Sequence, residues 1–252
     1  MKKQTFKTKQ AARQAVWDQL VTEKLARFPL PPYGRIPNFA GAKDAAKRLF
    51  ELPVFQQAKR MKVNPDAPQR YVRELALQKG ITIFVPTPRL RGGFRRFDPR
   101  CIPQEKLREA ASLSKGNQWS ERVSLARLPQ LDAIVTGSVA VTPKGHRCGK
   151  GEGYGDLEYA ILHELGHAPI PVATTVHEVQ LVKDFPHEHT DLPLTFIVTP
   201  ERTIHVPPRR KASQGQGIDW NKLPPQALTE MPILEELQEN LKVRVNRRLH
   251  RN

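Results

Sequence analysis

Residues 131–156 read LDAIVTGSVAVTPKGHRCGKGEGYGD, and this stretch decides the fold. Its first part, residues 131–135, is a short apolar run typical of a buried strand, and a second apolar run follows at residues 139–141. A glycine-rich run then extends from Arg147 to Gly155, and a helical pattern begins at Asp156 and continues to residue 165. A strand that leads through a loop into a helix is typical of α/β proteins.

The alternation of strands and helices continues on both sides of this stretch. Further strand-like runs lie at residues 58–63, 81–85, 172–176 and 194–198. Helical patterns lie at residues 9–28, 42–51, 69–78 and 103–111. The sequence therefore predicts an α/β fold with a mostly parallel sheet and helices on both faces. Ligands of such sheets bind beyond the carboxyl ends of the strands, which here are residues 64–66, 86–89 and 136–138.

Length and composition limit the class of protein. The chain has 252 residues, of which 38% are hydrophobic, so it can bury a core and is not disordered throughout. It contains no apolar run of about 18 residues, so we expect no membrane span. The two cysteines, Cys101 and Cys148, exclude a disulfide scaffold and favour a reducing, cytoplasmic location. We expect one α/β domain over residues 1–206, then a linker and a helix near residues 233–245 within a 207–252 appendage.

The net charge is +16, from 41 Lys and Arg against 25 Asp and Glu. Such a chain favours anionic partners, namely nucleic acid, phosphates or a polyglutamylated metabolite. Five arginines interleaved with two phenylalanines suit a nucleic-acid track, a solvated loop or a lid over an anionic ligand. They are Arg89, Arg91, Arg95, Arg96 and Arg100, with Phe94 and Phe97. No RRM, KH or zinc-finger signature is present, so nucleic acid is not the favoured partner.

The glycine-rich run has the properties of a phosphate cradle. Backbone N–H groups from Gly149 to Gly153 can point into one concavity, and the helix that starts at Asp156 adds the positive end of its dipole. Arg147 and Lys150 add formal charge. The run is neither a Walker A loop nor the G-x-G-x-x-G of a first βα turn, and the alternative is an ordinary flexible turn.

The first predicted helix carries two cations on an apolar stripe. Lys9 and Arg13 are one turn apart and share a face with Val16 and Leu20. Unpaired charges that face inward are expensive, so these two side chains need an anionic partner. The alternative is that both side chains extend to solvent at the start of the helix.

Residues 163–167 read HELGH and match the H-E-x-x-H pattern of zinc peptidases. His163 and His167 would hold the metal and Glu164 would polarise a bound water, with a third ligand from residues 177 or 187–189. Pro169 leaves little room for the helix to continue, and the longer zinc-peptidase pattern is absent. The alternative is an ordinary helix end at Gly166.

Residues 131–141 and 147–156 together resemble the signature of the 5-formyltetrahydrofolate cyclo-ligase family, a strand and a Pro-Gly-x-Ala turn followed by R-x-G-x-G-x-G-Y-Y-D. Lys9 and Arg13 match the K-x-x-x-R of that family, and residues 190–199 resemble its closing H-D-x-P-x-D-x-I-x-T block. The resemblance covers about residues 7–206. It is greatest to a divergent, cyclo-ligase-like branch that carries GRIPNF, KVNPDxPQR and GIDW, here at residues 34–39, 62–70 and 217–220.

The resemblance implies a fold similar to the ribose-phosphate isomerase and CoA-transferase group. It also implies an ATP- and Mg²⁺-dependent reaction that converts 5-formyltetrahydrofolate to 5,10-methenyltetrahydrofolate. Phosphoryl transfer to the formyl oxygen creates a leaving group, and N10 of the folate then closes the ring. The nucleotide would be bound by Lys9, Arg13, Arg147, Gly149, Lys150, Gly151, Glu152, Gly153 and Tyr154.

The resemblance also assigns the other site residues. Asp66, Lys150 and Asp156 are the expected catalytic residues, and Asp156 is the expected magnesium ligand. Substrate contacts are expected from Asp66, Gln69, Arg70, Pro86, Arg89 and Gly137. We expect a monomer or a homodimer that acts on a reduced folate or another heteroaromatic small molecule.

Several positions depart from the family pattern. Gly155 replaces the second tyrosine, Leu157 the following arginine, and Thr136 the proline of the turn. Asp66 falls near the block whose glutamate addresses the formyl group, and Thr195 replaces the aspartate of the closing block. The residues expected to bind phosphate therefore match the family pattern better than the residues expected to bind the substrate. The alternatives are therefore an ATP-binding relative with a different substrate, such as a thiamine-related compound, or a regulatory role.

Overall fold

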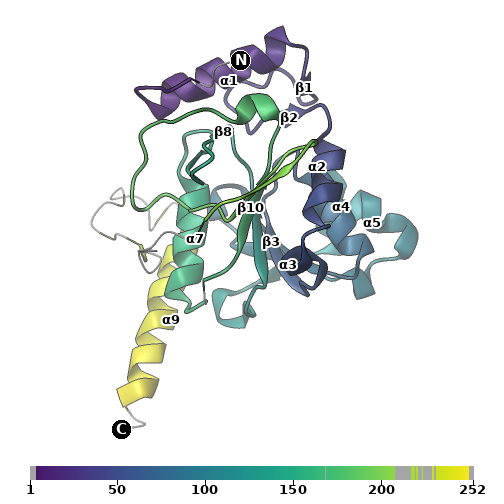
Figure 1. Ribbon diagram of the computed structural model, residues 1–252. Coiled ribbons are helices and arrows are strands. Elements are labelled where there is room, and N and C mark those ends of the chain that lie inside the picture. Colours follow the sequence, from purple (N-terminus) through teal and green to yellow (C-terminus); the bar gives the residue numbers. More distant parts are fainter. Residues whose placement is uncertain are drawn as a thin grey trace.

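The computed structural model describes residues 4–167, 169–207 and 231–249, together with residues 217, 218, 220, 223 and 229. Its centre is an eight-stranded sheet in the order β12-β11-β10-β7-β3-β4-β5-β6 (Figure 1). The pairs within β11-β10-β7-β3-β4 are parallel, and the outer strands β12, β5 and β6 pair antiparallel with their neighbours. The prediction of an α/β fold with a mostly parallel sheet is therefore confirmed.

The sheet strands are short. They are β3 (Arg60–Val63), β4 (Thr82–Pro86), β5 (Phe94–Phe97), β6 (Glu121–Val123), β7 (Ala133–Thr136), β10 (Val172–Thr175), β11 (Phe196–Val198) and β12 (Thr203–His205). Two small antiparallel pairs lie outside this sheet, β1 (Ala26–Arg27) with β2 (Asn38–Phe39) and β8 (Ala140–Val141) with β9 (Arg147–Cys148).

Helices cover both faces of the sheet because successive strand residues point to opposite sides. In β7, Ala133 and Val135 pack in the hydrophobic cluster with α2, α3, α4 and α5, whereas Ile134 packs in the cluster with α7. Figure 1 shows α1 lying across one end of the sheet. The helices are α1 (Lys9–Thr22), α2 (Ala42–Leu49), α3 (Pro53–Gln56), α4 (Arg70–Gln78), α5 (Leu107–Ala110), α6 (Leu113–Gly116), α7 (Tyr154–Glu164) and α9 (Pro232–Leu249).

The first helix ends at Thr22, six residues earlier than its apolar pattern predicts. Lys24 adopts a left-handed conformation, with φ of 56°, and Leu25 returns a backbone hydrogen bond of 2.8 Å to Leu20. This is the usual way in which a helix terminates at a left-handed residue, although glycine is the residue that normally fills the position. The remaining residues up to Arg27 then form the short strand β1.

Three other expectations differ from the structure. The apolar run at 139–141 is not a sheet strand but the β8 arm of a hairpin, because the chain reverses before the glycine-rich loop. The predicted helix at 103–111 is split into a 3₁₀ turn and the short α5. The helix expected to begin at Asp156 begins at Tyr154.

The arginine-rich run is mostly part of the sheet edge. Arg96 forms ion pairs with Asp98 and Glu121, Arg100 forms one with Asp98, and Arg95 donates to Ser120. The three interpretations of this run stay predictions. Arg89 lines the main cavity described below, whereas the other four arginines line neither of the two cavities described below. The two phenylalanines are buried in the core and offer no stacking surface.

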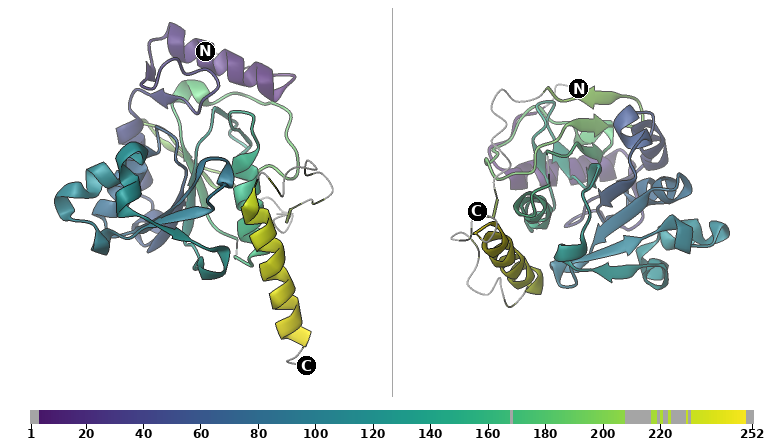
Figure 2. Two further views of the ribbon diagram at one scale, coloured as in Figure 1. Left: turned by 180° about the vertical axis from the view of Figure 1, so that it is seen from behind. Right: turned by 90° about the horizontal axis from the view of Figure 1, so that it is seen from below.

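The C-terminal helix packs on the body of the protein at its first turns. Ile233, Leu234 and Leu237 of α9 are buried in one cluster with Ile161 of α7 and Phe94 of β5. The far end of α9 projects away from the sheet in Figure 1 and in the left-hand view of Figure 2. The linker expected from residue 207 lies largely outside the described residues, so the division at residue 206 stays a prediction. Within the described residues, none of the helices has the length and apolarity needed to cross a bilayer.

The end of α1 gives a stability prediction. A left-handed conformation costs an L-residue about 1–2 kcal/mol, whereas glycine adopts it freely but loses more entropy on folding. Lys24→Gly is therefore expected to stabilise the fold by about 0.5–1 kcal/mol, measured by urea unfolding. Lys24→Ala is the matched control and should give no such gain. A Lys24→Gly variant no more stable than the alanine control would contradict this explanation of the helix end.

Candidate functional site

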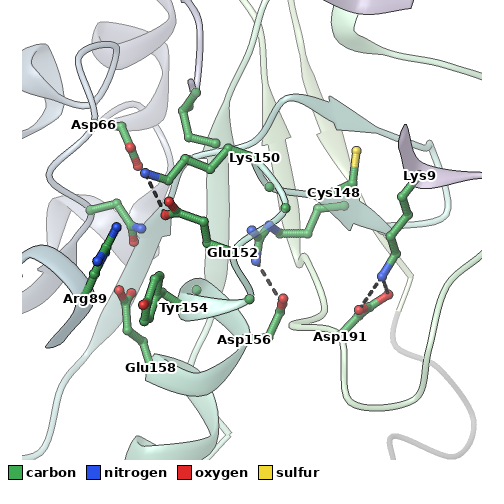
Figure 3. Close-up of a pocket in the computed structure, with 18 of the residues that line it drawn as sticks. Lys9, Asp66, Arg89, Cys148, Lys150, Glu152, Tyr154, Asp156, Glu158 and Asp191 are labelled. Carbon is green, nitrogen blue, oxygen red and sulfur yellow. Dashed lines mark hydrogen bonds and ion pairs between the residues drawn. The ribbon is translucent and has the colours of Figure 1, made fainter. Parts of the chain in front are cut away.

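A cavity of about 400 Å³ opens at the carboxyl ends of β3 and β4 (Figure 3). Its walls are the first turns of α1, the glycine-rich loop before α7, the loops after β3 and β4, and part of the 188–191 segment. Most of the residues expected at the site line it, although they come from five separate parts of the chain. They are Lys9, Arg13, Asp66, Arg89, Gly137, Arg147, Gly149, Lys150, Gly151, Glu152, Gly153, Tyr154 and Asp156.

Helix α1 is held on the glycine-rich loop by its apolar face. Ala12, Val16 and Leu20 are buried in a cluster that includes Ala140 and Cys148 of the β8–β9 hairpin. This packing places the polar start of the helix over the loop that follows the hairpin. The stripe on which sequence analysis placed the two cations is therefore the buried face of α1, as expected.

Both N-terminal cations reach the cavity. Arg13 Nε donates a 2.7 Å hydrogen bond to the carbonyl of Gly149, and its Cζ lies 3.4 Å from the position that a Cβ on Gly151 would take. Lys9 Nζ lies 2.6 Å from a carboxylate oxygen of Asp191. The two side chains therefore have partners at the cavity and do not simply extend into solvent.

The glycine-rich loop leaves donors available. Within the described ranges, the backbone N–H groups of Lys150, Gly151, Glu152 and Gly153 make no hydrogen bond with other protein groups. The loop leads directly into α7, whose first turn adds the positive end of its dipole. Free backbone donors beside a helix N-terminus are the usual means of binding phosphate.

Arg147 lies directly beneath two glycines of the loop, Gly149 and Gly155. Its guanidinium is buried beneath the start of α7 and donates a 2.9 Å hydrogen bond to Asp156. A Cβ at Gly155 would lie 3.0 Å from Arg147 Nη1, and a Cβ at Gly149 would lie 2.6 Å from Nη2. A side chain at position 155 or 149 would therefore need the Arg147 guanidinium to shift.

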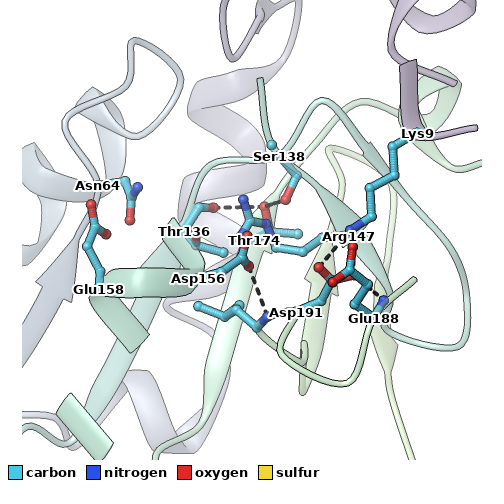
Figure 4. Close-up of polar contacts among 12 residues, drawn as sticks. Lys9, Asn64, Thr136, Ser138, Arg147, Asp156, Glu158, Thr174, Glu188 and Asp191 are labelled. Carbon is cyan, nitrogen blue, oxygen red and sulfur yellow. Dashed lines mark hydrogen bonds and ion pairs between the residues drawn. The ribbon is translucent and has the colours of Figure 1, made fainter. Parts of the chain in front are cut away.

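The cavity contains carboxylates as well as cations. Lys9 pairs with Asp191, Lys150 with Glu152 at 2.8 Å, and Arg147 with Asp156 (Figure 4 for the first and third pairs). In the part of the chain that the structure describes, two cavity cations have no carboxylate partner, Arg13 and Arg89. A phosphate that enters the cavity would therefore meet two guanidinium groups that have no carboxylate partner. It could also replace Glu152 as the partner of Lys150, because that ion pair is half-exposed.

Arg89 is held over the cavity by a strained backbone. Its φ is 52° and that of Leu90 is 56°, both in the left-handed region that non-glycine residues rarely adopt. The Leu90 side chain is fully buried, and Thr87 Oγ1 accepts from the N–H of Gly92 and donates to the carbonyl of Gly93. Strain of this kind persists where surrounding contacts fix it, and it is concentrated at ligand sites.

Asp66 lies in a tight environment next to the cavity. A Cβ added at Gly137 would lie 2.5 Å from Asp66 Oδ2, so only glycine leaves room for this carboxylate. The buried Arg73 donates to the backbone carbonyls of Asn64 and Asp66, at 2.6 and 3.2 Å, and fixes the loop. Burial raises the pKa of the Asp66 carboxyl, and the positive charge of Lys150 offsets only part of that rise.

A second cavity, of about 460 Å³, adjoins the first. It lies between the proline-rich 29–36 segment and the loop after β3, and it shares Asp66 and Lys150 with the first cavity. Tyr33, Arg35 and Ile36 contribute its aromatic, cationic and apolar walls. Two of the three residues expected to be catalytic, Asp66 and Lys150, therefore lie where the cavities meet.

Three expected substrate contacts lie elsewhere. Gln69 is fully buried and donates to Thr175 Oγ1 at 3.1 Å, Arg70 begins α4, and Pro86 ends β4. None of the three lines either cavity.

The HELGH segment forms a helix end. Helix α7 stops at Glu164, Gly166 is left-handed with φ of 76°, and the buried His167 accepts from the N–H of Leu131. Among the residues that the structure describes, no three His, Cys, Asp or Glu side chains gather in a group suited to a metal ion. The zinc ligands considered from the sequence are therefore not assembled.

Sequence reasoning missed a buried polar group at the cavity. Lys62 on β3 forms an ion pair with Glu158 on α7, which lines the cavity next to Asn64. The signal was present, because Lys62 interrupts a strand pattern and Glu158 stands on the helix face that turns inward. A lysine and a glutamate at buried positions of two elements indicate a pair only when those elements are known to pack together.

The comparisons with known proteins agree with this geometry. The family model described as the 5-formyltetrahydrofolate cyclo-ligase family matches residues 6–200. The chain belongs to this family.

Relatives and one solved structure support the assignment. The chain is 42% identical over 249 residues to a mouse methenyltetrahydrofolate synthase domain-containing protein, covering 96% of this chain and 66% of the relative. The human counterpart is 39% identical over 238 residues, covering 92% and 61%. The chain thus spans less than two thirds of the length of these relatives. The NMR structure of Aquifex aeolicus 5,10-methenyltetrahydrofolate synthetase has the same fold, with a TM-score of 0.50 at 15% identity, covering 81% of this chain and 95% of that chain.

Asp66, which is half-buried, and Asp98, which is buried, give opposite stability predictions. The pKa of Asp66 is raised by burial, so its ionised form costs stability above the folded-state pKa, and Asp66→Asn should stabilise the protein at pH 7. That gain should shrink as the pH falls and Asp66 takes up its proton. Asp98 is the matched control, because hydrogen bonds from Arg100 and Arg96 hold its pKa well below the usual range. Asp98→Asn should therefore destabilise the protein by about 1–3 kcal/mol at pH 7.

The measurement is urea unfolding of both variants between pH 4 and pH 8. A loss of stability for Asp66→Asn at pH 7 would show that its ionised carboxylate is well compensated and would contradict the stated cause of its pKa.

Proposed function

We propose that this chain is an ATP-dependent cyclo-ligase that converts 5-formyltetrahydrofolate to 5,10-methenyltetrahydrofolate. The observation that carries the proposal is the contact of Arg13 with a glycine-rich loop that has free backbone donors. Lys9 lines the same cavity, and this cavity meets a second cavity at Asp66. Membership of the family and the printed names of the relatives support the choice of reaction and substrate. We propose the cytoplasm as the location, since Cys101 and the buried Cys148 are both free.

The nucleotide half of the site is formed by α1 and the glycine-rich loop. Arg13 and Lys150 supply charge to the phosphates, the free N–H groups of residues 150–153 supply hydrogen bonds, and Arg147 holds the loop from beneath. Phosphoryl transfer depends mainly on positioning and on neutralising charge that is shared among the phosphate oxygens. These residues supply both without forming a covalent bond.

A magnesium ion suits this half of the site. Mg²⁺ usually takes one or two carboxylates together with phosphate oxygens and waters, so it needs no ready-made cage of three acidic residues. Asp156 lines the cavity in the first turn of α7, and its Oδ1 is held by Arg147 and by the N–H of Leu192. We propose that Asp156 would hold the ion, which neutralises phosphate charge when bound.

The substrate half of the site is formed by the loops after β3 and β4. Asp66 lies where the two cavities meet, beside Gly137, and Arg89 offers an unpaired cation to an anionic group of the substrate. We therefore place the formyl-bearing part of the substrate near Asp66 and Lys150. Gln69, Arg70 and Pro86 line neither cavity, so we propose no direct contact for them.

The direct test is an enzyme assay with the purified chain. Adding ATP, Mg²⁺ and 5-formyltetrahydrofolate should produce the absorbance of the methenyl product, and Asp66→Asn should abolish most of it. No product from the wild-type chain would contradict the cyclo-ligase function. Retained ATP binding in that case would favour a relative that acts on a different heteroaromatic substrate.

The phosphate contacts give a further prediction. Arg13→Ala and Lys150→Ala should each weaken ATP binding by about 1–3 kcal/mol, measured by calorimetry, because each removes a charge-assisted contact. Glu152→Gln is the matched control, because it removes the carboxylate that competes with the ATP phosphates for Lys150. It should bind ATP at least as tightly as the wild type. Unchanged ATP affinity in both alanine variants would contradict the proposed phosphate site.

A further inference from the structure

A buried ion pair lies at the base of the main cavity. Lys62, in the middle of β3, is 1% exposed, and Glu158, in the second turn of α7, is 4% exposed. Their side chains form an ion pair, and Lys62 Nζ also donates a 2.6 Å hydrogen bond to Asn64 Oδ1. Lys62 lies on the sheet face that packs against α7, among positions otherwise filled by Phe84 and Ile134.

Stability does not explain this pair. Removing two charges from water costs several kcal/mol per ion. A buried ion pair therefore often stabilises a fold no more than two well-packed apolar residues in the same place would. Burial raises the pKa of Glu158, and the charge of Lys62 opposes that rise. The pair therefore keeps a carboxylate at a place where the fold alone would favour an apolar side chain.

Glu158 faces the ligand space. It lines the main cavity together with Asn64, Pro65 and Tyr154, on the substrate side and away from α1 (Figures 3 and 4). A carboxylate has about four acceptor positions, and the ion pair with Lys62 leaves some of them available to a ligand. The neighbours are an aromatic ring, a proline and an amide, which suit a flat polar ring.

We propose that Glu158, held in place by Lys62, is a specificity residue that accepts hydrogen bonds from the N–H edge of the substrate's ring. The ligand class is a heterocycle with adjacent ring N–H and exocyclic amino donors, such as a 2-amino-4-oxopteridine. The proposal rests on the proposed function, because it concerns the substrate half of the same cavity. Lys62 acts through Glu158 as a positioning residue and makes no contact of its own with the ligand.

The test measures binding, independently of turnover. Calorimetry compares 5-formyltetrahydrofolate with its analogue that lacks the 2-amino group, on the full chain without ATP, so that no turnover occurs. The wild type should bind the amino compound at least tenfold more tightly. Glu158→Gln should lose most of this preference while its ATP affinity stays unchanged.

Two further variants separate recognition from folding. The double variant Lys62→Met/Glu158→Met removes both charges with side chains of similar volume, so it should fold and yet show no preference for the amino compound. Glu121→Gln removes a carboxylate from β6 that lines neither cavity, and it should retain the wild-type preference.

The outcomes distinguish this inference from the proposed function. Preference for the amino compound without formation of methenyl product would support the role of Glu158 and contradict the cyclo-ligase reaction. Equal binding of the two compounds to the wild type, no binding of either, or full preference in Glu158→Gln or in the double variant would overturn the role of Glu158.

Discussion

The contact of Arg13 with the carbonyl of Gly149 joins parts of the chain that are 136 residues apart, and the site depends on it. It forms because the apolar face of α1 is buried on the β8–β9 hairpin, which leads directly into the glycine-rich loop. The burial of Ala12, Val16 and Leu20 therefore fixes the position of the Arg13 guanidinium over the glycine-rich loop. Without this docking, the loop would be a flexible turn with one lysine, which is the alternative interpretation of its sequence.

Charge is nearly balanced within the cavity, although the whole chain has an excess of +16. Carboxylates on α7, on the glycine-rich loop and in the 188–191 segment pair with the lysines and with Arg147. The excess of positive charge lies largely elsewhere on the molecule. We therefore attribute the selectivity of the proposed phosphate site to the placement of Arg13, Arg89 and the free backbone donors, and overall basicity contributes little to it. The half-buried Asp66 and the buried Lys62–Glu158 pair also lie at this cavity, and neither is expected to add to the stability of the fold.

The sequence predicted well which residues of α1 and of the glycine-rich loop line the main cavity, and it predicted less well which residues of the loops after β3 and β4 do so. Lys9, Arg13 and residues 147–156 form local patterns with a physical meaning, an inward cation pair and a glycine-rich loop before a helix, so they were found without coordinates. Gln69 was expected at the substrate but is bonded to Thr175 in the core, because the direction of a side chain at the start of α4 depends on packing. Lys62 and Glu158 are separated by 96 positions, and no local pattern joins them. The early end of α1 was missed because Lys24 takes a conformation that sequence rules assign to glycine.

Hydrogen–deuterium exchange of the backbone amides of residues 149–153, with and without MgATP, is the sharpest test of the proposed phosphate site. We place the phosphates on the N–H groups of residues 150–153, which have no partner of their own within the described chain, so bound nucleotide should slow their exchange markedly. Residues at the outer edge of the sheet, such as those of β6, should exchange at the same rate in both conditions. Slower exchange elsewhere, with the 149–153 loop unchanged at saturating nucleotide, would contradict the account.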